Sequence, residues 1–305
     1  MSAVQRPEAT AAVGETGGVD AADAAGTVRR SVADAWNDAA GGWHGHRESI
    51  RSWLREPTKR MLDLAHVGAG GKVLDVAAGA GDQTRDIASR VGANGMICVT
   101  DVSPRILELA RSEFPGAAGP RLEFVVADAE NLSAAGSGFD AAVCRLGLMF
   151  CADPVTALSS MLGSLRVGGR VGGVVFSQPE ANPSVAIPMR LAARHAGRSP
   201  PDPRAPGALF SLCDPPRLRA MIEAAGFVDV EIEVVAAGFG ARSCADYVEF
   251  IRTSGSPIIE MLRGLPAPQQ SDAWRDIERA LNVYSGAGGW ESPTELLVFG
   301  ATRAR

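Results

Sequence analysis

The sequence predicts an α/β protein with a doubly wound, mostly parallel sheet of seven strands. Short β-branched runs alternate with stretches of helical apolar spacing, a pattern typical of parallel strands joined by crossover helices. Three helices also have a legible start, because a capping side chain stands directly before a proline at Ser103-Pro104, Asp153-Pro154 and Asp214-Pro215. The last strand follows a long helical excursion, so we expect the sheet to close with a hairpin-like, antiparallel pair.

Composition excludes several classes of protein. The chain has 305 residues, of which 46% are hydrophobic and 21% are charged, enough for a large core and an ordinary soluble surface. A net charge of −5 argues against binding nucleic-acid phosphates. The longest stretch without a charged residue, 154–165, is far shorter than the roughly 18 apolar residues that a membrane span needs. We therefore expect no membrane span and no nucleic-acid partner.

The five cysteines favour a reducing compartment. An odd number leaves one thiol unpaired in any full disulfide scheme, and the sequence contains no C-x-x-C. Reduced thiols in a cytoplasmic protein are therefore favoured over a disulfide or zinc framework, and we expect no metal site.

The N-terminal part predicts a tail followed by a helical lid. Residues 1–27 hold almost no large apolar side chain, which predicts a disordered tail. Apolar residues at helical spacing over 28–66 predict two helices lying against a larger body, joined at a hinge formed by Gly41-Gly42.

The main domain is predicted over 67–305. Its seven strands are expected at 73–77, 96–101, 122–127, 141–145, 170–177, 228–235 and 295–302. Two lid insertions, at about 178–212 and 244–285, interrupt it. The first is Pro- and Arg-rich and too long for a structureless connection without a function, and the second is helical.

The first strand ends in the most informative segment. Asp75 is followed by a turn of small residues from Ala77 to Gly81, and a helix begins near Gln83. Small residues let a ligand approach the backbone, next to the free N–H groups of a helix start. The dinucleotide-binding pattern G-x-G-x-x-G requires a third glycine at the position of Thr84. In addition, the carboxylate of Asp75 before the turn would repel a pyrophosphate. A ligand with an ammonium group explains Asp75 better.

Two further acids extend this site. Asp101 ends the second strand, where a carboxylate can accept both hydroxyls of a ribose. Asp128, next to Ala129, follows the third strand and can accept from an exocyclic amine. Because the carboxyl ends of parallel strands line one crevice, these acids predict a ligand with an ammonium, a ribose and an amine, but no phosphate.

Five segments resemble the successive motifs of class I S-adenosylmethionine-dependent methyltransferases, particularly the type found in ubiquinone and menaquinone biosynthesis: 73–84, 99–103, 126–130, 139–145 and 165–169. The likeness covers roughly 71–177 and implies a Rossmann-like fold and S-adenosylmethionine as cofactor. The family's usual first glycine is Ala77 here, which suits the turn if that residue does not need a positive φ. Its Pro-Gly-Gly turn before the fifth strand is Val167-Gly168-Gly169.

The resemblance implies a role for each end of the cofactor. Asp75 and the Ala77–Gly81 turn would hold the methionine end, Asp101 the ribose and Asp128 the adenine, with Arg145 under the methyl donor. The full predicted cofactor set is Asp75, Ala77, Gly79, Gly81, Gln83, Asp101, Val102, Asp128, Ala129 and Arg145.

The acceptor is less well defined. Trp36 and Trp43 are read first as packing residues, and alternatively as a lid over the cofactor or an aromatic substrate, together with Phe150 and Phe210. His44 is the one candidate base, although a solvated or capping role is favoured for it. Positioning is the main requirement for methyl transfer, so no strict catalytic constellation is expected.

The segments 28–64, 178–212 and 244–284 are expected to roof the site together, and their Trp, Phe, Met and Leu content favours a small, largely apolar acceptor. The predicted function is methyl transfer to the oxygen, nitrogen or carbon of a small, apolar or aromatic metabolite. The alternatives are a nicotinamide-dependent oxidoreductase and a non-catalytic S-adenosylmethionine-binding protein. The partner expected is a small-molecule acceptor, and a homodimer is left open.

Overall fold

A seven-stranded sheet forms the centre of the computed structural model, which describes residues 21–116, 119–199 and 202–304, with side chains from Val32 onward. The strand order is β3-β2-β1-β4-β5-β10-β6. Strands β1 to β5 pair in parallel, and β10 is antiparallel to both of its neighbours. The predicted fold class and the closing antiparallel pair are therefore confirmed. The strands are β1 (Lys72–Val76), β2 (Met96–Asp101), β3 (Arg121–Val126), β4 (Phe139–Arg145), β5 (Leu165–Phe176), β6 (Phe227–Ala236) and β10 (Glu295–Arg303).

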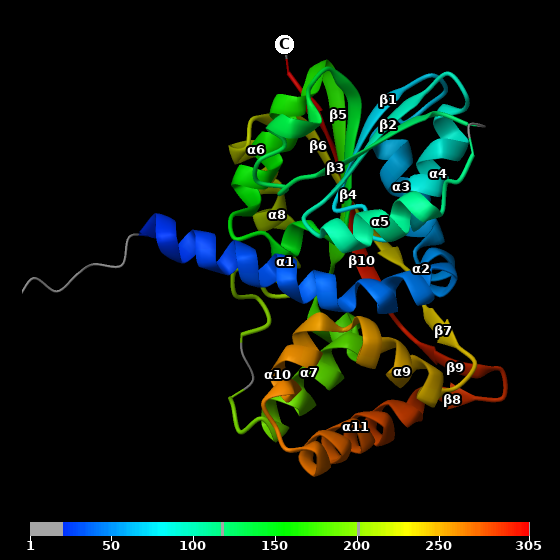
Figure 1. Ribbon diagram of the computed structural model, residues 1–305, viewed down its shortest axis with the longest axis vertical. Coiled ribbons are helices and arrows are strands. Elements are labelled where there is room, and N and C mark those ends of the chain that lie inside the picture. The colour runs from blue at the N-terminus through cyan, green and yellow to red at the C-terminus, as the bar shows by residue number, and fades with distance from the viewer. Residues whose placement is uncertain (1–20, 117–118, 200–201, 305) are drawn as a thin grey trace, which may run out of the picture.

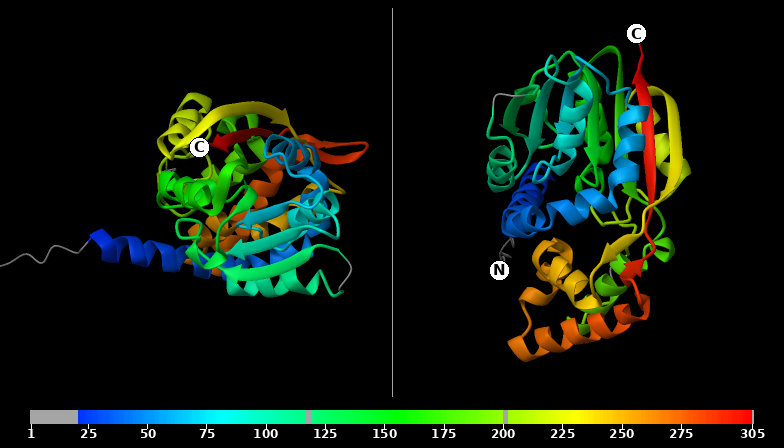
Figure 2. Two further views of the ribbon diagram at one scale, coloured as in Figure 1. Left: turned by 90° about the horizontal axis from the view of Figure 1, so that it is seen from above. Right: turned by 90° about the vertical axis from the view of Figure 1, so that its right-hand side faces the viewer.

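Helices cover both faces of this sheet (Figures 1 and 2). One face carries α3 (Arg55–Leu64), α4 (Asp82–Val91) and α5 (Pro104–Ser112), and the other carries α6 (Pro154–Ser164) and α8 (Pro215–Ala224). All three predicted prolines lie in the first turn of a helix. Ser103 Oγ accepts from Ile106 N at 3.1 Å and Asp153 Oδ1 from Val155 N at 3.0 Å, whereas Asp214 makes no side-chain cap.

The N-terminal segment forms three helices instead of the two predicted: α1 (Ala21–Gly45), α2 (Arg47–Trp53) and α3. The predicted hinge at Gly41-Gly42 is wrong, because α1 runs through both glycines and ends before His46. Gly42 lets α1 pack closely against the helix that contains Thr253, since a Cβ at position 42 would lie 2.0 Å from Thr253 O. The predicted tail mostly falls on residues 1–20, outside the described residues, and α1 begins seven residues before the predicted lid.

The two insertions pack together as a helical cap on the far side of α1 from the sheet (Figure 1). The first contains helix α7, which packs against helices of the second. We call α7, α9, α10 and α11 the cap. Their bounds are α7 (Pro183–His195), α9 (Cys244–Ser254), α10 (Ser256–Arg263) and α11 (Ala267–Leu281). A small sheet that the sequence did not predict, β7 (Phe239–Ala241), β9 (Gly289–Ser292) and β8 (Ser285–Gly286), lies beside them. Four short 3-10 turns are η1 (Ser133–Ala135), η2 (Leu148–Phe150), η3 (Pro179–Ala181) and η4 (Asn282–Tyr284).

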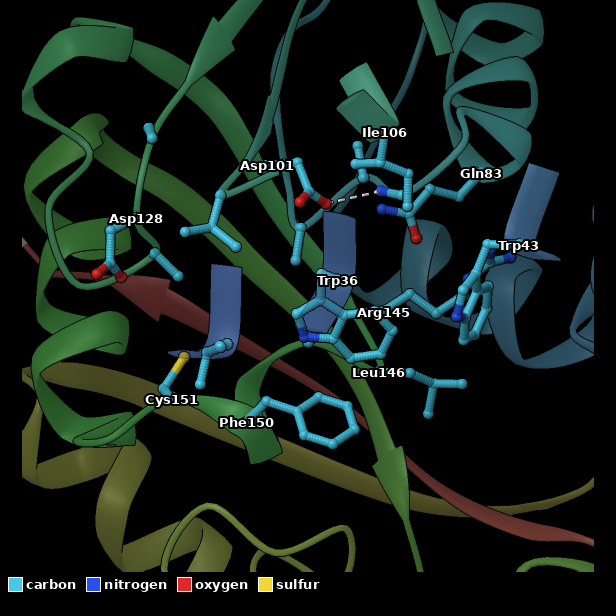
Figure 3. A pocket seen from close by; sticks show the side chains of 18 of the residues that line it. Trp36, Trp43, Gln83, Asp101, Ile106, Asp128, Arg145, Leu146, Phe150 and Cys151 are labelled. Atoms are coloured by element: carbon cyan, nitrogen blue, oxygen red, sulfur yellow. Dashed lines mark hydrogen bonds between the residues drawn. The ribbon is translucent and has the colours of Figure 1, made fainter. Parts of the chain in front are cut away.

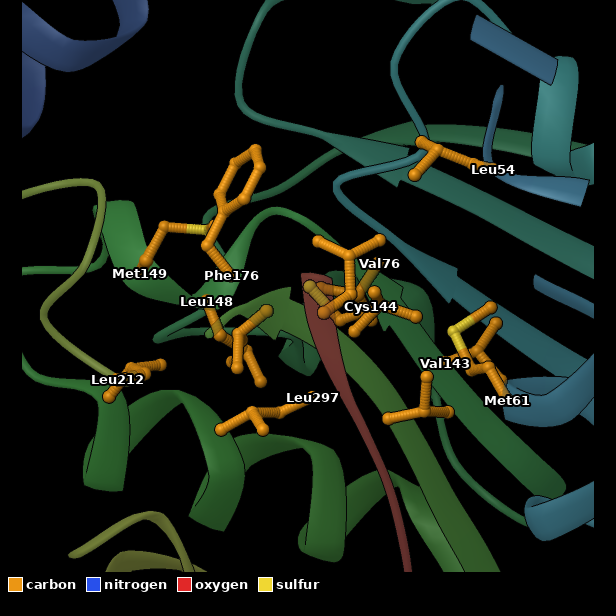
Figure 4. Close-up of a cluster of buried hydrophobic side chains, with 14 of the residues drawn as sticks. Leu54, Met61, Val76, Val143, Cys144, Leu148, Met149, Phe176, Leu212 and Leu297 are labelled. Carbon is orange, nitrogen blue, oxygen red and sulfur yellow. The ribbon is translucent and has the colours of Figure 1, made fainter. Parts of the chain in front are cut away.

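The core lies between the sheet and its helices (Figure 4). Val76 of β1, Val143 of β4 and Met61 of α3 all belong to this core and are buried. Glycines let α3 reach the sheet: a Cβ at Gly172 would lie 2.8 Å from Met61 O, and one at Gly300 would lie 2.7 Å from Leu64 Cβ. All five cysteines are free, and four are buried. Among the described residues, no helix is both long and apolar enough to cross a membrane.

Candidate active site

A cavity of about 130 Å³ lies at the carboxyl ends of β1, β2 and β4, covered by α1 (Figure 3). Most of the predicted site residues meet there. Those that line it are Ala77, Gly79, Gln83, Asp101, Val102, Asp128, Ala129, Arg145, Trp36, Trp43 and Phe150. Asp75, Gly81, His44 and Phe210 do not line it. The wall includes four carboxyl groups, of Asp82, Asp101, Asp128 and Glu130, against the one guanidinium of Arg145. This balance favours a cationic ligand over pyrophosphate.

Asp75 lies behind the cavity wall instead of facing the ligand space. Its side chain is fully buried, and its carboxylate accepts from Thr84 Oγ1 at 2.7 Å and from Gln83 Nε2. Burial raises the pKa of Asp75 to about 7, against the opposing effect of these two hydrogen bonds. Asp75 therefore orients Gln83, and Gln83 reaches the cavity.

The amide oxygen of Gln83 has no hydrogen-bond partner. Oε1 is buried and unsatisfied, while Nε2 of the same amide donates to Asp75. A buried acceptor without a donor costs free energy on the order of 1–3 kcal/mol. A ligand that brings an N–H donor to this part of the cavity would remove that cost.

Asp101 closes the turn that follows β1. Its Oδ2 accepts from Gly79 N and its Oδ1 from Ser103 N, both at 3.0 Å. Burial raises the pKa of Asp101, and the backbone hydrogen bonds oppose that effect. The carboxylate thus holds the turn and lines the cavity at once (Figure 3).

Arg145 forms a buried ion pair at the end of β4. Its Nη2 donates to Asp82 Oδ2, its Nη1 donates to Thr58 Oγ1 at 2.9 Å, and both charged side chains are almost fully buried. The pair joins the end of β4 to the start of α4 and to α3. Asp82 is a site residue that the sequence reasoning missed. Its position directly after Gly81, in the first turn of α4, suits an acid at a helix N-terminus and was the only local signal.

Two residues other than glycine adopt left-handed backbone conformations at the cavity. Ala77 has φ +52° and Leu146 has φ +58°, at the ends of the adjacent strands β1 and β4. Such residues cost on the order of 1–3 kcal/mol each and cluster at functional sites. The condition set for an alanine at position 77 is therefore not met: Ala77 does take a positive φ. A Cβ at Gly147 would lie 2.5 Å from Ala77 Cβ, so this glycine makes room for the alanine methyl.

The turn after β3 forms the far wall. Asp128 Oδ1 accepts from Glu130 N at 2.9 Å, and Glu130 Oε1 accepts from Ala152 N at 2.8 Å. Ala127 and Ala129 also line the cavity here. Small side chains between two fixed carboxyl groups leave a surface that a flat ring with an exocyclic amine fits.

A second cavity of about 100 Å³ adjoins the first. The residues that line both are Trp36, Trp43, Leu146 and Phe150. The rings of Trp36 and Phe150 meet edge to face with centroids 5.1 Å apart. Trp43 Nε1 donates to Ser254 O at 3.1 Å, which ties α1 to the cap. Both tryptophans therefore line the two cavities, and their role as a lid over cofactor or substrate stays a prediction.

His44 and Phe210 line neither cavity. His44 Nε2 is 2.9 Å from Glu113 Oε1, and Arg47 and Arg85 pair with the same carboxylate. Burial opposes ionisation of Glu113, but these partners lower its pKa to about 2. His44 thus fastens α1 to the main domain, a structural role that differs from the solvated or capping role favoured from the sequence. Phe210 is buried and its ring packs behind the cavity wall, 5.7 Å from that of Phe176.

The three segments expected to roof the site, 28–64, 178–212 and 244–284, do supply most of the second cavity's wall, but the sequence did not single out most of the residues that line it. Apart from the four shared residues, this wall comes from α2, β5, β7, α7, α9, α10 and two loop residues, and includes Phe239, Tyr247 and Phe250. Their signal is only helical or alternating apolar spacing, which does not separate a cavity wall from a core. Among the described residues, no cluster of three or more His, Cys, Asp or Glu side chains could hold a metal ion.

Comparison with known proteins shows which family the segment holding β1 to β5 is similar to. Residues 49–191 match the model of the ubiE/COQ5 methyltransferase family. The ubiquinone/menaquinone biosynthesis C-methyltransferase UbiE of Ectopseudomonas mendocina is 37% identical over 158 residues, which cover 51% of this chain and 61% of that relative.

Solved structures show the same fold. The YcgJ protein of Bacillus subtilis superposes with a TM-score of 0.54 at 18% identity, over 82% of this chain and 99% of that one. Phosphoethanolamine N-methyltransferase 2 of Haemonchus contortus, in complex with phosphomonomethylethanolamine and S-adenosylhomocysteine, gives a TM-score of 0.50 at 14% identity, over 86% and 58%. The resemblance predicted from the sequence is thus confirmed: over residues 49–191, which hold strands β1 to β5 and most of the polar lining of the first cavity, this chain is similar to the ubiE/COQ5 methyltransferases.

Proposed function

We propose that this protein transfers a methyl group from S-adenosylmethionine to a small, apolar or aromatic metabolite. One observation carries the proposal: a cavity lined by acids at strand ends adjoins an apolar cavity, and four residues line both. Methyl transfer needs such a pair of adjoining sites, because donor and acceptor must come within about 3–3.5 Å.

The residues of the first cavity fit the cofactor. The unpaired Oε1 of Gln83 can accept from the ammonium group of the methionine end. Asp101 supplies carboxylate oxygens for the ribose hydroxyls, and the wall from Asp128 to Glu130 suits the adenine. The excess of carboxyl groups suits a ligand that carries a sulfonium and an ammonium. A nicotinamide dinucleotide fits less well, since Thr84 fills the third glycine position and donates to the buried Asp75.

S-Adenosylmethionine supplies the activated methyl carbon, so the protein's own task is to bind, orient and exclude water. Trp36 and Trp43 cover both cavities from α1, and Phe150 closes them from the other side. Arg145, held by Asp82 and Thr58, fixes the end of β4 at the first cavity. None of the described residues that line the second cavity is a carboxylate, imidazole or amine. The acceptor's proton is therefore not taken by a base from that wall.

The proposal includes a cytoplasmic location, which the five free thiols support. No nucleic-acid partner is expected at a net charge of −5. A homodimer stays a prediction.

Calorimetric titration of the full chain tests the cofactor. We expect S-adenosylmethionine and S-adenosylhomocysteine to bind and NADH not to bind. Asp101→Ala should weaken S-adenosylmethionine binding roughly 10- to 100-fold, because hydrogen bonds to a charged group are worth about 1.5–3 kcal/mol. Asp101→Asn keeps one carbonyl oxygen that can still accept a backbone N–H of the turn. Comparing it with Asp101→Ala distinguishes a loss of ligand contacts from a collapse of the turn.

Asp272→Ala is the control, since Asp272 is a half-exposed acid on α11 outside both cavities. Unchanged affinity in both Asp101 variants would exclude the ribose assignment, and saturable NADH binding would favour the oxidoreductase. A screen of small phenols, quinols and amines with labelled methyl donor, read as S-adenosylhomocysteine release, then tests turnover and excludes a purely binding protein if any acceptor reacts.

A further inference from the structure

We infer that the second cavity binds the methyl acceptor, that this acceptor is an uncharged ring compound with one polar atom, and that the hydroxyl of Ser254 orients it. The inference rests on the proposed function and adds the class of substrate and a positioning residue to it.

The wall of the second cavity selects for an uncharged ring. Eight of its eighteen lining residues are aromatic, and none carries a formal charge at neutral pH. Tyr247 is the only residue with an ionisable side chain among them; its hydroxyl donates to Ser184 O at 3.0 Å, and burial raises its pKa. A charged acceptor would lose its hydration without gaining a partner, which costs several kcal/mol or more. A volume of about 100 Å³ suits a compound of about one ring.

One polar atom in this wall lacks a partner. Ser254 Oγ is buried and makes no hydrogen bond, although the residue is only 3% exposed. Its backbone carbonyl is already used by Trp43 Nε1, at 3.1 Å. Neighbouring hydroxyls on the same helix are satisfied: Thr253 Oγ1, for example, donates to Glu249 O at 2.9 Å. A hydroxyl or carbonyl oxygen of the acceptor would satisfy Ser254 Oγ, the one side-chain atom of the described wall that is both buried and without a partner.

The place of Ser254 suits an orienting role. It ends α9, where α1 crosses the cap at Gly42, and a Cβ on that glycine would lie 2.9 Å from Ser254 Oγ. Trp43, which touches both cavities, is bonded to the same residue. An acceptor bonded to Ser254 is thus held against the side chains that separate it from the first cavity.

Most of this wall lies outside the segment that matches the methyltransferase family. The match ends at residue 191, whereas Phe239, Tyr247, Phe250 and Ser254 come later in the chain. Selection of the acceptor is therefore a property of this chain's own cap, and the family match does not fix it.

Three probes that share one skeleton test the inference: p-cresol, toluene and p-toluate. Each is titrated into the full chain already saturated with S-adenosylhomocysteine, with binding read by calorimetry and by tryptophan fluorescence. Three of the five tryptophans, Trp36, Trp43 and Trp53, line the cavity and should report its occupancy. We expect p-cresol to bind more tightly than toluene, and p-toluate to bind at least 10-fold more weakly than p-cresol.

Ser254→Ala should lower the affinity for p-cresol about 3- to 10-fold, the size of one hydrogen bond, and leave toluene unchanged. Thr253→Ala, which removes the neighbouring hydroxyl outside the cavity, should change neither. Val185→Phe adds a ring to the wall of the second cavity only, and should weaken p-cresol and toluene at least 10-fold while S-adenosylhomocysteine still binds.

The inference is overturned if p-cresol binds equally well to wild type and Ser254→Ala, if Val185→Phe leaves both neutral probes unaffected, or if p-toluate binds best. Failure of S-adenosylhomocysteine to bind the wild-type chain is a separate outcome, because it would overturn the proposed function itself.

Discussion

Ala77 adopts a backbone conformation that glycine would adopt at lower cost, so we expect Ala77→Gly to stabilise the fold. Its φ is +52°, in the left-handed region where a Cβ costs about 1–2 kcal/mol. Part of this gain is lost, because glycine raises the conformational entropy of the unfolded chain and so lowers the free energy of unfolding by about 0.4–1 kcal/mol. The net expectation is a gain of about 0.5–1 kcal/mol in the free energy of unfolding, or about 1–2 °C in Tm for a chain of this size.

Urea denaturation at pH 7, supported by thermal melts, measures this change. Ala78→Gly is the matched control, since Ala78 lies in the same turn and is buried but is not among the residues with positive φ. That variant loses a buried methyl group and adds chain entropy, so it should destabilise the fold by about 1–2 kcal/mol. Equal destabilisation by the two glycine variants would refute the assignment of strain to Ala77.

Gly147→Ala extends the test to the neighbouring strand. The new Cβ would lie 2.5 Å from Ala77 Cβ and 2.8 Å from Cys144 Sγ, which predicts a loss of about 1–3 kcal/mol from overpacking. In the Ala77→Gly background the first clash is absent, so the loss should shrink by about 1 kcal/mol. If the changes in free energy of unfolding of the two substitutions simply add, the clash with the Ala77 methyl is not the reason why Gly147→Ala is destabilising.

Two further predictions concern buried charges. Because burial raises the pKa of Asp75 to about 7, the folded state binds this proton more tightly than the unfolded chain does; wild-type stability relative to Asp75→Asn should therefore fall between about pH 4 and 7, by up to about 1.4 kcal/mol per pH unit, and level off above pH 7. A pH-independent difference in urea denaturation would contradict it. Asp82→Ala leaves the Arg145 guanidinium buried without its carboxylate and should cost about 3–5 kcal/mol, whereas Asp272→Ala, which breaks a half-exposed pair with Arg275, should cost less than about 1 kcal/mol. If the two variants lose similar amounts of free energy of unfolding, the Arg145 guanidinium does not depend on Asp82 to offset the cost of its burial.

The sequence by itself determined the order of the seven strands along the chain and the edge of the sheet where the first cavity lies. These features depend on local rules: β-branched runs, a capping residue before proline, and small residues after the first strand. Asp101 and Asp128 were correctly placed at the cavity because each stands at or just after the end of a parallel strand, and such ends share one edge of the sheet.

Tertiary structure decided which way individual side chains face and what covers the site. Asp75 follows the same strand-end pattern as Asp101, yet its carboxylate turns inward onto Thr84 and Gln83. The second cavity joins Trp36 to Phe250 and Ile258, more than two hundred residues away along the chain. No local spacing encodes that contact, because an apolar helix face looks the same in sequence whether it packs in a core or walls a cavity. Only the packing of the cap against α1 shows which apolar side chains line the second cavity and which belong to the core.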